Sequence, residues 1–316
     1  MTALAPDMPA RSVIAAREIP DVLTDRLAAG PGRWEQRLLG ETPGLRRVLL
    51  CDYHGPRAPR PRQLVAKAYA TAEGERTARL MSDVHDKLTT MPDAIVAVPR
   101  PIFYDAPHRL LVQEVATGRP YPDLAMSARV RAHLAAAGSA LAMLHGLRVP
   151  AGPPRALHDN LRELVRPHPE VLAERVPDVA GRVEAILAGL DARHRAHGAV
   201  PATLTHRDLH LRQLLRGRGR VWVLDWDLAA ATDPALDLGN ISAYMATKLP
   251  AERARACTDA LLDGYVAAGG PEPVARPLYE AFTYMRLACK RFRLAERDWH
   301  EGVKDMLTRA ETALEA

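Results

Sequence analysis

The fold of this chain is decided by the segment Thr203-Leu-Thr-His-Arg-Asp-Leu-His-Leu-Arg-Gln-Leu-Leu215 and by Val221-Trp-Val-Leu-Asp-Trp-Asp227, which follows it. The two apolar runs in these segments are separated by a basic turn at residues 216–220 that contains two glycines. Two short apolar runs joined by such turn residues are typical of a β-hairpin. A hairpin folds its ends together, so we expect polar residues before the turn to face carboxylates after it.

The polar residues at the two ends of this hairpin can carry chemistry. The first segment contributes His206, Asp208, His210 and Gln213, and the second ends with Asp225 followed by a further Trp-Asp pair. Unpaired carboxylates cost free energy in an apolar setting, so such a group is rarely kept for packing alone. The sequence therefore predicts a cluster of oxygen ligands with an imidazole beside it.

This part of the chain resembles the catalytic segment of the aminoglycoside phosphotransferase and choline kinase group. The resemblance lies in the pattern His-x-Asp-Leu-His, in an amide five positions after the Asp, and in a strand that ends in Asp-Trp-Asp. The continuation Asp233-Pro-Ala-Leu-Asp237-Leu resembles the sequence that follows in that group. These proteins are small-molecule relatives of protein kinases. The resemblance implies an α+β, bilobal, protein-kinase-like fold. A small N-terminal antiparallel sheet with one main helix would form a nucleotide-binding lobe at residues 1–116. A larger, mainly helical lobe at residues 117–316 would hold the catalytic and acceptor sites.

The resemblance also implies roles for individual residues. Asp208 would accept or orient the proton of the acceptor hydroxyl, and Asp225 would be a Mg²⁺ ligand. Gln213 stands where the group usually has Asn, and its extra methylene loosens the geometry of a second metal position. Arg207 stands where the small-molecule kinases usually carry Gly. Asp237 is expected to cap or anchor the loop backbone, and the plainer alternative, a helix N-cap, is compatible with that role.

The two histidines of the loop receive different expectations. His206 is expected to position the loop through a hydrogen bond, which is a structural role. His210 is expected to point toward the phosphates or toward the acceptor, and the sequence does not choose between them.

The first part of the chain is expected to form a sheet. Strand-like segments occupy residues 33–39, 45–52 and 63–70, a helix occupies 74–88, and residues 95–98 and 110–115 would complete a five-stranded sheet. The glycine-flanked turn at residues 40–44 is either a plain hairpin turn or a backbone cradle for a phosphate.

A lysine on the third strand is the expected contact for the nucleotide. Alternation places Val65, Lys67 and Tyr69 on one face, where a lysine among apolar residues needs a partner. In the resembling group this lysine holds the α- and β-phosphates and pairs with an acid on the next helix. Glu75 and Asp83 are both candidates for that acid, and the choice stays open.

The segment at residues 113–122 reads as a hinge because it is polar and contains Gly118 and two prolines. In the resembling group the adenine ring hydrogen-bonds to the backbone of this segment. We therefore assign Gln113 and Val115 to the nucleotide site.

The rest of the chain is expected to be helical. A stripe of apolar residues from Val130 to Leu144 predicts an amphipathic helix, and its Gly138 is tolerable if something packs closely there. Two helical patterns follow at residues 157–197, and further ones at 240–247, 251–268, 277–294 and 299–314. Five cations lie close together near the end, namely Arg286, Lys290, Arg291, Arg293 and Arg297. They form either a solvated face or a wall that disfavours a polycationic acceptor.

Composition limits the partners and the compartment. Hydrophobic residues make up 47% of the chain, and the net charge of +5 is spread along it, which favours a solvated surface over a nucleic-acid site. No apolar run approaches the roughly 18 residues of a membrane span. The three cysteines are far apart and lack metal-ligand spacing. We therefore expect a cytoplasmic monomer or weak homodimer with no nucleic-acid or membrane partner.

The leading hypothesis is a phosphotransferase that uses ATP, with GTP as the alternative nucleotide, and Mg²⁺. It would move the γ-phosphoryl group to a hydroxyl of a small molecule such as an antibiotic, a sugar or an amino alcohol. Two alternatives remain open. One is a metal-dependent hydrolase built on His206, Asp208, His210 and Asp225, because mixed imidazole and carboxylate ligands can hold a metal. The other is a catalytically dead pseudokinase that binds nucleotide.

Overall fold

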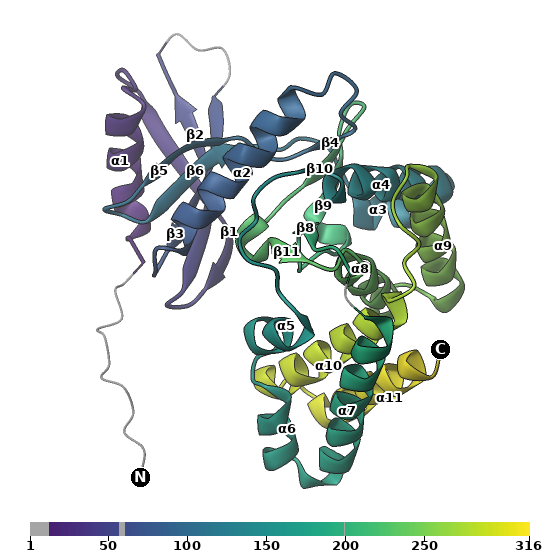
Figure 1. Ribbon diagram of the computed structural model, residues 1–316. Helices are drawn as coiled ribbons and strands as arrows, with labels where there is room; N and C mark the ends of the chain where they lie inside the picture. Colours follow the sequence, from purple (N-terminus) through teal and green to yellow (C-terminus); the bar gives the residue numbers. More distant parts are fainter. Residues whose placement is uncertain (1–12, 57–60, 199) are drawn as a thin grey trace. The chain divides into compact units, whose positions relative to one another are not determined.

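The computed structural model (Figure 1) describes residues 13–56, 61–198 and 200–316. The chain divides into two compact units. Of the described residues, the first unit comprises 13–56, 61–92 and 97–117, and the second comprises 93–96, 118–198 and 200–316. An antiparallel sheet dominates the first unit and helices dominate the second, which confirms the predicted α+β class.

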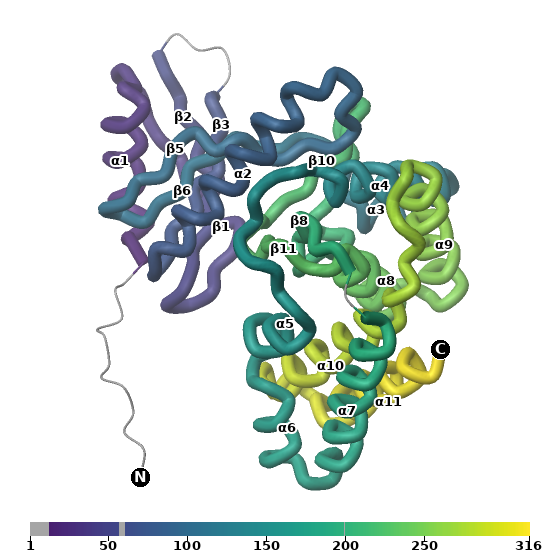
Figure 2. Tube along the Cα trace, in the orientation of Figure 1, coloured from purple at the N-terminus to yellow at the C-terminus, as the bar shows by residue number. Residues whose placement is uncertain are grey.

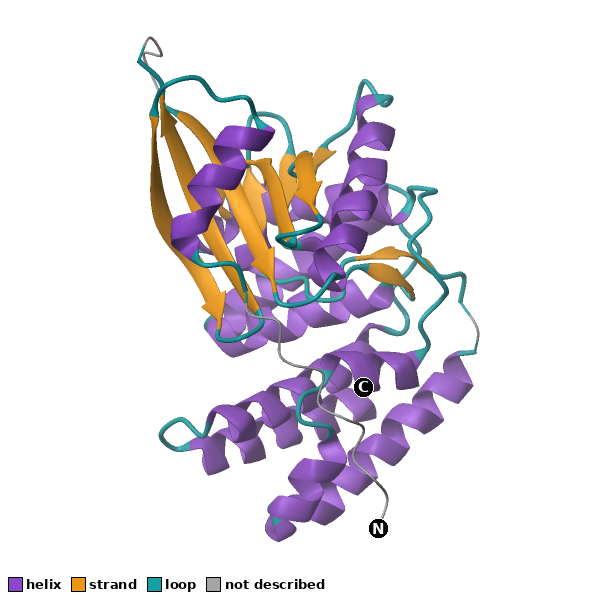
Figure 3. Ribbon diagram, turned by 90° about the vertical axis from the view of Figure 1, so that its left-hand side faces the viewer, coloured by secondary structure: helices purple, strands orange, loops and turns teal. Residues whose placement is uncertain are grey.

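The first unit is built on a five-stranded antiparallel sheet with the order β1-β2-β3-β6-β5, drawn in orange in Figure 3. Its strands are β1 (Arg33–Thr42), β2 (Arg46–His54), β3 (Arg62–Tyr69), β5 (Pro101–Asp105) and β6 (Leu110–Glu114). Its helices are η1 (Ala16–Glu18), α1 (Ile19–Arg26) and α2 (Glu73–Thr89). Ile19 and Leu23 of α1 belong to one buried cluster with Leu64, Ala66 and Ala68 of β3. Because side chains alternate along a strand, Val65, Lys67 and Tyr69 point to the opposite face.

The expected fifth strand of this sheet was wrong. Residues 95–98 yield only the short β4 (Val96–Ala97), which pairs with β10 (Val221–Val223) in another sheet. The fifth strand is β5, which lies in a segment whose prolines suggested a connection. Proline is tolerated at the start of an edge strand, where its missing N–H breaks no ladder, and Pro101 occupies that place beside a register shift.

The turn between β1 and β2 is tighter than residues 40–44 suggested. Thr42 pairs with Arg46, and the Leu45 N–H donates to the Thr42 carbonyl over 3.0 Å. Gly44 has φ +71, which glycine adopts without strain. Residues 40–42, which were predicted to lie in the turn, instead extend β1 beyond a bulge near Gly40.

The second unit contains two small sheets, β4-β10-β9-β7 and β11-β8. Its remaining strands are β7 (Arg119–Pro120), β8 (Thr203–Thr205), β9 (Leu214–Arg216), β10 (Val221–Val223) and β11 (Ala230–Thr232). Its first helices are α3 (Tyr121–Ala125), α4 (Val130–His145), α5 (Leu157–Leu164), α6 (Pro169–Arg175) and α7 (Ala180–His197). Its last helices are α8 (Ala235–Lys248), α9 (Ala251–Ala267), α10 (Arg276–Leu294) and α11 (Trp299–Glu315). Single turns occur at η2 (Pro177–Val179), η3 (Leu211–Gln213) and η4 (Trp226–Leu228).

Residues 157–197 form three helices and a single turn where two helical patterns were expected. Pro169 and Pro177 each begin a new element, because proline fits the first turn of a helix but interrupts its interior. These helices and α8, α10 and α11 share a buried cluster that includes Leu190, Leu236 and Leu307. Figure 2 shows α5, α6, α7, α10 and α11 gathered in this part of the chain.

Two glycines allow α4 and α9 to pack closely. A Cβ atom on Gly138 would lie 1.9 Å from the Leu261 carbonyl oxygen, and one on Gly264 would lie 2.1 Å from that of Ala135. Gly138 therefore interrupts the apolar stripe of α4 because the neighbouring backbone occupies the space of a side chain. Among the described residues, no helix is both long enough and apolar enough to cross a membrane.

Candidate active site

The predicted hairpin forms as expected. β9 and β10 are antiparallel, with Leu214 opposite Val223 and Arg216 opposite Val221. The Leu224 N–H donates to the Gln213 carbonyl over 2.9 Å, which closes the open end of the hairpin. There the Gln213 Nε2 lies 3.4 Å from the Asp225 Oδ2. The hairpin therefore brings the Gln213 amide and the Asp225 carboxylate together, as its local sequence predicted.

Asp225 adopts a backbone conformation that is uncommon for a residue with a side chain. It precedes η4 with φ 61 and ψ 69, in the left-handed region. Such a conformation costs on the order of 1–3 kcal/mol and persists where neighbouring packing holds it. The next residue, Trp226, is fully buried, and its indole N–H donates to the Val223 carbonyl over 2.9 Å. This contact fixes the turn that presents the Asp225 carboxylate.

Asp208 lies in the loop between β8 and η3, and its side chain is 24% exposed. Its Oδ1 accepts an ion-paired contact from the Arg286 guanidinium of α10 over 2.9 Å. The same guanidinium donates to the Arg207 carbonyl over 3.3 Å. α10 therefore holds both the carboxylate and the backbone of the loop.

A buried carboxylate anchors this loop from the side of α8. Asp237 is fully buried and accepts hydrogen bonds from the His206 and Arg207 N–H groups, both over 2.7 Å. Its Oδ2 also lies 3.2 Å from the His145 Nε2 of α4. Asp237 thus anchors the loop backbone, and the alternative of a helix cap is wrong, because Pro234 occupies the N-cap of α8.

His206 has the structural role that was expected. Its Nε2 lies 2.7 Å from the Leu224 carbonyl oxygen, and its Nδ1 accepts from the Asp208 N–H over 3.4 Å. A carbonyl oxygen can only accept, so the Nε2 must carry the proton. The Nε2 therefore ties the loop to the end of β10, and the Nδ1 bonds to the backbone of the loop itself.

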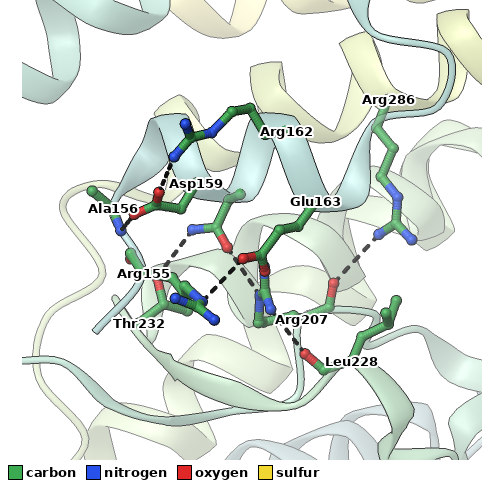
Figure 4. A network of polar contacts seen from close by, with 10 residues as sticks. Arg155, Ala156, Asp159, Arg162, Glu163, Arg207, Leu228, Thr232 and Arg286 are labelled. Carbon is green, nitrogen blue, oxygen red and sulfur yellow. Dashed lines mark hydrogen bonds and ion pairs between the residues drawn. The ribbon is translucent and has the colours of Figure 1, made fainter. Parts of the chain in front are cut away.

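Arg207 stands where the family resemblance led us to expect glycine, and its backbone has a conformation that glycine adopts more easily. Its φ of +67 lies in the left-handed region. The buried guanidinium donates to Asn160 Oδ1 over 2.9 Å, to Glu163 Oε2 over 2.6 Å and to the Leu228 carbonyl over 3.2 Å (Figure 4). These bonds hold the strained backbone from the side of α5.

Two buried asparagines complete the support of the loop. The Asn160 Nδ2 donates to the Thr232 Oγ1 over 3.1 Å, so α5 is also tied to β11. The Asn240 Nδ2 donates to the Leu209 carbonyl over 3.1 Å, and its Oδ1 accepts from Thr283 over 3.0 Å. The loop is therefore fixed by α5, α8 and α10 together.

His210 lies against Tyr244 of α8, with ring centroids 5.0 Å apart. Burial lowers the pKa of His210, and the charges of His206, Arg286 and Lys290 lower it further, while Asp208 acts in the opposite direction. The imidazole is therefore neutral at pH 7. Whether it serves the phosphates or the acceptor stays a prediction.

The expected nucleotide residues lie in the first unit. Lys67 of β3 is 4% exposed, and its Nζ lies 5.9 Å from the centroid of the Tyr69 ring. Glu75 forms an ion pair with Arg79 one turn later on α2, and Asp83 is exposed on the same helix. The structure thus places Lys67 on a buried face and both candidate acids on α2.

The last two residues that were expected at the nucleotide site lie at the end of β6. Gln113 is buried opposite Val65, and among the described residues its Oε1 has no hydrogen-bond partner. Val115 follows β6 and is half-buried. A buried acceptor without a partner is uncommon in native structures, so Gln113 is a candidate contact for a ligand.

The donor atoms at the hairpin suit a hard cation. An amide oxygen on Gln213 and the carboxylate of Asp225 are oxygen ligands, and Mg²⁺ is usually held by one or two carboxylates together with phosphates and water. In the described part of the chain, no three side chains of His, Cys, Asp or Glu form a group that could hold a metal. Because both nitrogens of His206 bond to the backbone, one of the two imidazoles expected at a hydrolase centre is already engaged.

Arg286, Asn160 and Glu163 were not recognised as site residues from the sequence. Arg286 was assigned to a basic helix face, which did not indicate that it pairs with Asp208. A polar residue in a helix carries no local signal for a partner far away in the chain.

The sequence profile of the Phosphotransferase enzyme family matches residues 41–278, which is more than half of the chain. The chain therefore belongs to this family. A search of curated proteins found no match.

Solved structures share the fold at low sequence identity. One is a thermostable mutant of aminoglycoside phosphotransferase APH(4)-Ia in a ternary complex with ADP and hygromycin B. It is 14% identical to this chain, with a TM-score of 0.66, and the alignment covers 94% of this chain and 98% of the mutant's chain. A choline/ethanolamine kinase family protein from Mesorhizobium loti is 19% identical with a TM-score of 0.62 and coverages of 94% and 95%. The amicoumacin kinase hAmiN, in complex with AMP-PNP, Ca²⁺ and Ami, is 13% identical with a TM-score of 0.63 and coverages of 94% and 96%.

Proposed function

We propose that this protein transfers the γ-phosphoryl group of ATP to a hydroxyl group of a small molecule. The observation that carries the proposal is the pair of acids at one hairpin, Asp208 in its leading loop and Asp225 at its end, in a member of the Phosphotransferase enzyme family. Phosphoryl transfer needs an oriented hydroxyl, a charge clamp on the phosphates and little covalent chemistry. The two carboxylates supply the two kinds of group that this reaction requires.

Asp208 is the proposed proton acceptor of the acceptor hydroxyl. A general base must be within hydrogen-bond reach of its proton and held in a fixed position. Asp237, His206 and Arg207 hold the loop backbone, and Arg286 holds the carboxylate itself. One oxygen of Asp208 is paired with Arg286, which leaves Oδ2 as the atom to receive the proton.

Asp225 and Gln213 are the proposed ligands of Mg²⁺. When bound, the ion would neutralise negative charge on the phosphates. The left-handed backbone of Asp225 and the closed end of the hairpin keep these two side chains adjacent. Gln213 offers its Oε1 to the ion after rotation of the amide, because its Nε2 otherwise faces the Asp225 carboxylate.

Residues of the first unit are proposed to hold the nucleotide. The Lys67 ammonium would contact the α- and β-phosphates, and the backbone near Gln113 and Val115 would contact the adenine. Glu75 and Asp83 remain the two candidate partners of Lys67. On this proposal residues 1–116 form the nucleotide-binding lobe and residues 117–316 the catalytic and acceptor-binding lobe. Solved relatives of this fold bind ADP or AMP-PNP, which supports nucleotide use.

The function is tested by a screen of hydroxylated acceptors with γ-labelled ATP and GTP. We expect labelled phosphate to appear on an acceptor when Mg²⁺ is present and to disappear when EDTA is added. Candidate acceptors are sugars, amino alcohols and antibiotics such as hygromycin B and streptomycin, which the solved relatives bind. A chain that binds nucleotide but never transfers or hydrolyses its phosphate would be a pseudokinase, and the proposal would fail.

Replacement of the buried lysine is expected to affect nucleotide use first. Lys67→Ala should raise the KM for ATP by about tenfold or more, because one charge–phosphate contact is lost. Initial rates measured at varied ATP concentration check this. The matched control is Lys87→Ala, which removes an exposed lysine at the end of α2 and should leave the KM unchanged. An unaltered KM in the Lys67 variant would remove Lys67 from the site.

A further inference from the structure

The proposed proton acceptor lies among cations. Arg286 pairs with Asp208 over 2.9 Å, and Lys290 and Arg293 follow it one and two turns later on α10. Residues spaced by three or four positions share one face of a helix, so these three cations form a stripe on the side of Asp208. Residues 281–294 contain no Asp or Glu that could offset them.

A second helix adds a cation from another direction. Tyr244 of α8 contacts the His210 ring, and Lys248 lies one turn later at the end of the same helix. Residues 238–248 also contain no acid. α8 and α10 therefore both bring positive charge to the loop that carries Asp208, and neither brings negative charge from these segments.

The titratable groups of this region respond to the same charges. Burial raises the pKa of Tyr244. The charge of Arg286 acts to lower this pKa, and the charge of Asp208 acts to raise it. Desolvation by the surrounding protein lowers the pKa of Lys290, and the charges of Arg286, Arg293 and Lys248 lower it further. Asp208 acts in the opposite direction. Asp208 is the single acid among the groups that act on Tyr244, Lys290 and His210. One carboxylate does not balance Arg286, Lys290, Arg293 and Lys248.

We propose that the acceptor of this enzyme is a hydroxylated small molecule that carries an anionic group, and that Lys290 binds this group beside Asp208. This inference rests on the proposed function of the same site. The Arg286 guanidinium is already bonded to Asp208 and to the Arg207 carbonyl, so Arg286 positions the loop. Lys290 is exposed and keeps its ammonium available to a ligand. Like charges disfavour a polycationic acceptor at this place.

A carboxylate and a phosphate ester share the chemistry that Lys290 would recognise, so the test separates them on one scaffold. Glucuronate carries a carboxylate, glucose 6-phosphate a phosphate, glucose no charge and glucosamine a positive charge. Hygromycin B adds a polycation. Binding to the full-length protein is measured calorimetrically with AMP-PNP and Mg²⁺ at saturation, so that the nucleotide site is filled. Phosphate transfer to each compound is measured separately with γ-labelled ATP.

We expect at least one anionic sugar to bind about tenfold more tightly than glucosamine, with the difference falling as salt is added. Lys290→Glu should abolish this preference, because it reverses one charge at an exposed position. The control Arg297→Gln removes a cation whose side chain is 95% exposed on the turn after α10, and it should preserve the preference. Whichever of the carboxylate and phosphate binds more tightly identifies the anionic group.

The inference is overturned if the anionic sugars bind no better than glucosamine or hygromycin B, or if the preference survives Lys290→Glu. It is also overturned if Lys290→Glu raises the KM for ATP and leaves acceptor binding unchanged, because the lysine would then serve the nucleotide. Efficient transfer to hygromycin B would refute the inference and retain the proposed function. An anionic preference without phosphate transfer to any compound would retain the anion-binding site at Lys290 and count against the proposed phosphotransferase function.

Discussion

Asp208→Asn is expected to lower kcat by roughly 10²–10⁴-fold, the range that a positioned general base contributes. Asparagine keeps the size of the side chain and an oxygen for Arg286, but it cannot receive the proton of the acceptor hydroxyl. The side chain is 24% exposed and its ion pair is partly solvated, so stability should change by at most about 1 kcal/mol. Initial rates and thermal unfolding measured on the same preparation separate these two effects.

The matched control is Asp178→Asn, which also removes a carboxylate from an ion pair. Asp178 lies 3.6 Å from Lys304 and its side chain is 57% exposed, away from the loop of Asp208. This variant should turn over normally. Turnover of the Asp208 variant within a few-fold of the parent protein would show that another group receives the proton.

Asp237→Asn is expected to destabilise the protein by roughly 3 kcal/mol and to impair turnover with it. The native carboxylate accepts from the backbone N–H groups of His206 and Arg207, each over 2.7 Å, and is fully buried. An amide of the same shape has one oxygen, so its NH₂ group must face one of those N–H donors. A buried donor then lacks an acceptor, and the loop that carries Asp208 loses one of its two anchors to α8.

Urea unfolding measures the first effect, and initial rates of the folded fraction measure the second. Asp259→Asn is the control, because it makes the same chemical change at an exposed position of α9 and should alter stability by less than about 0.5 kcal/mol. A stable Asp237→Asn protein with normal turnover would mean that the loop does not depend on this carboxylate. Loss of stability with normal turnover of the folded fraction would limit Asp237 to a structural role.

The parts of the fold that depend on neighbouring residues could be predicted. Alternation along β3 and the glycine turn between β9 and β10 are local, so the strand of Lys67 and the hairpin with Gln213 and Asp225 were expected correctly. β5 was not predicted because it becomes a strand through its pairing with β6. The prolines in and around β5 favour a connection instead of a strand. Edge strands depend on their neighbour more than on their sequence.

The parts of the site that depend on distant residues could not be predicted. The guanidinium of Arg207 meets Glu163 and Asn160 across 44 and 47 positions of the chain, and Arg286 meets the Arg207 carbonyl across 79. No periodicity links such residues, because their contacts follow from how α5 and α10 pack rather than from any local conformation. Arg207 was expected only as a departure from glycine, and the structure adds its left-handed backbone and its partners Asn160 and Glu163 on α5.

The sequence by itself determined the family resemblance, the hairpin and the identity of its two carboxylates, because all of these are contained in one short stretch with its own turn chemistry. Only the tertiary structure decided how the loop of Asp208 is held, since a buried polar residue must find its partners wherever packing places them. The helices α5, α8 and α10 provide those partners, and α8 and α10 also bring the positive charge around Asp208.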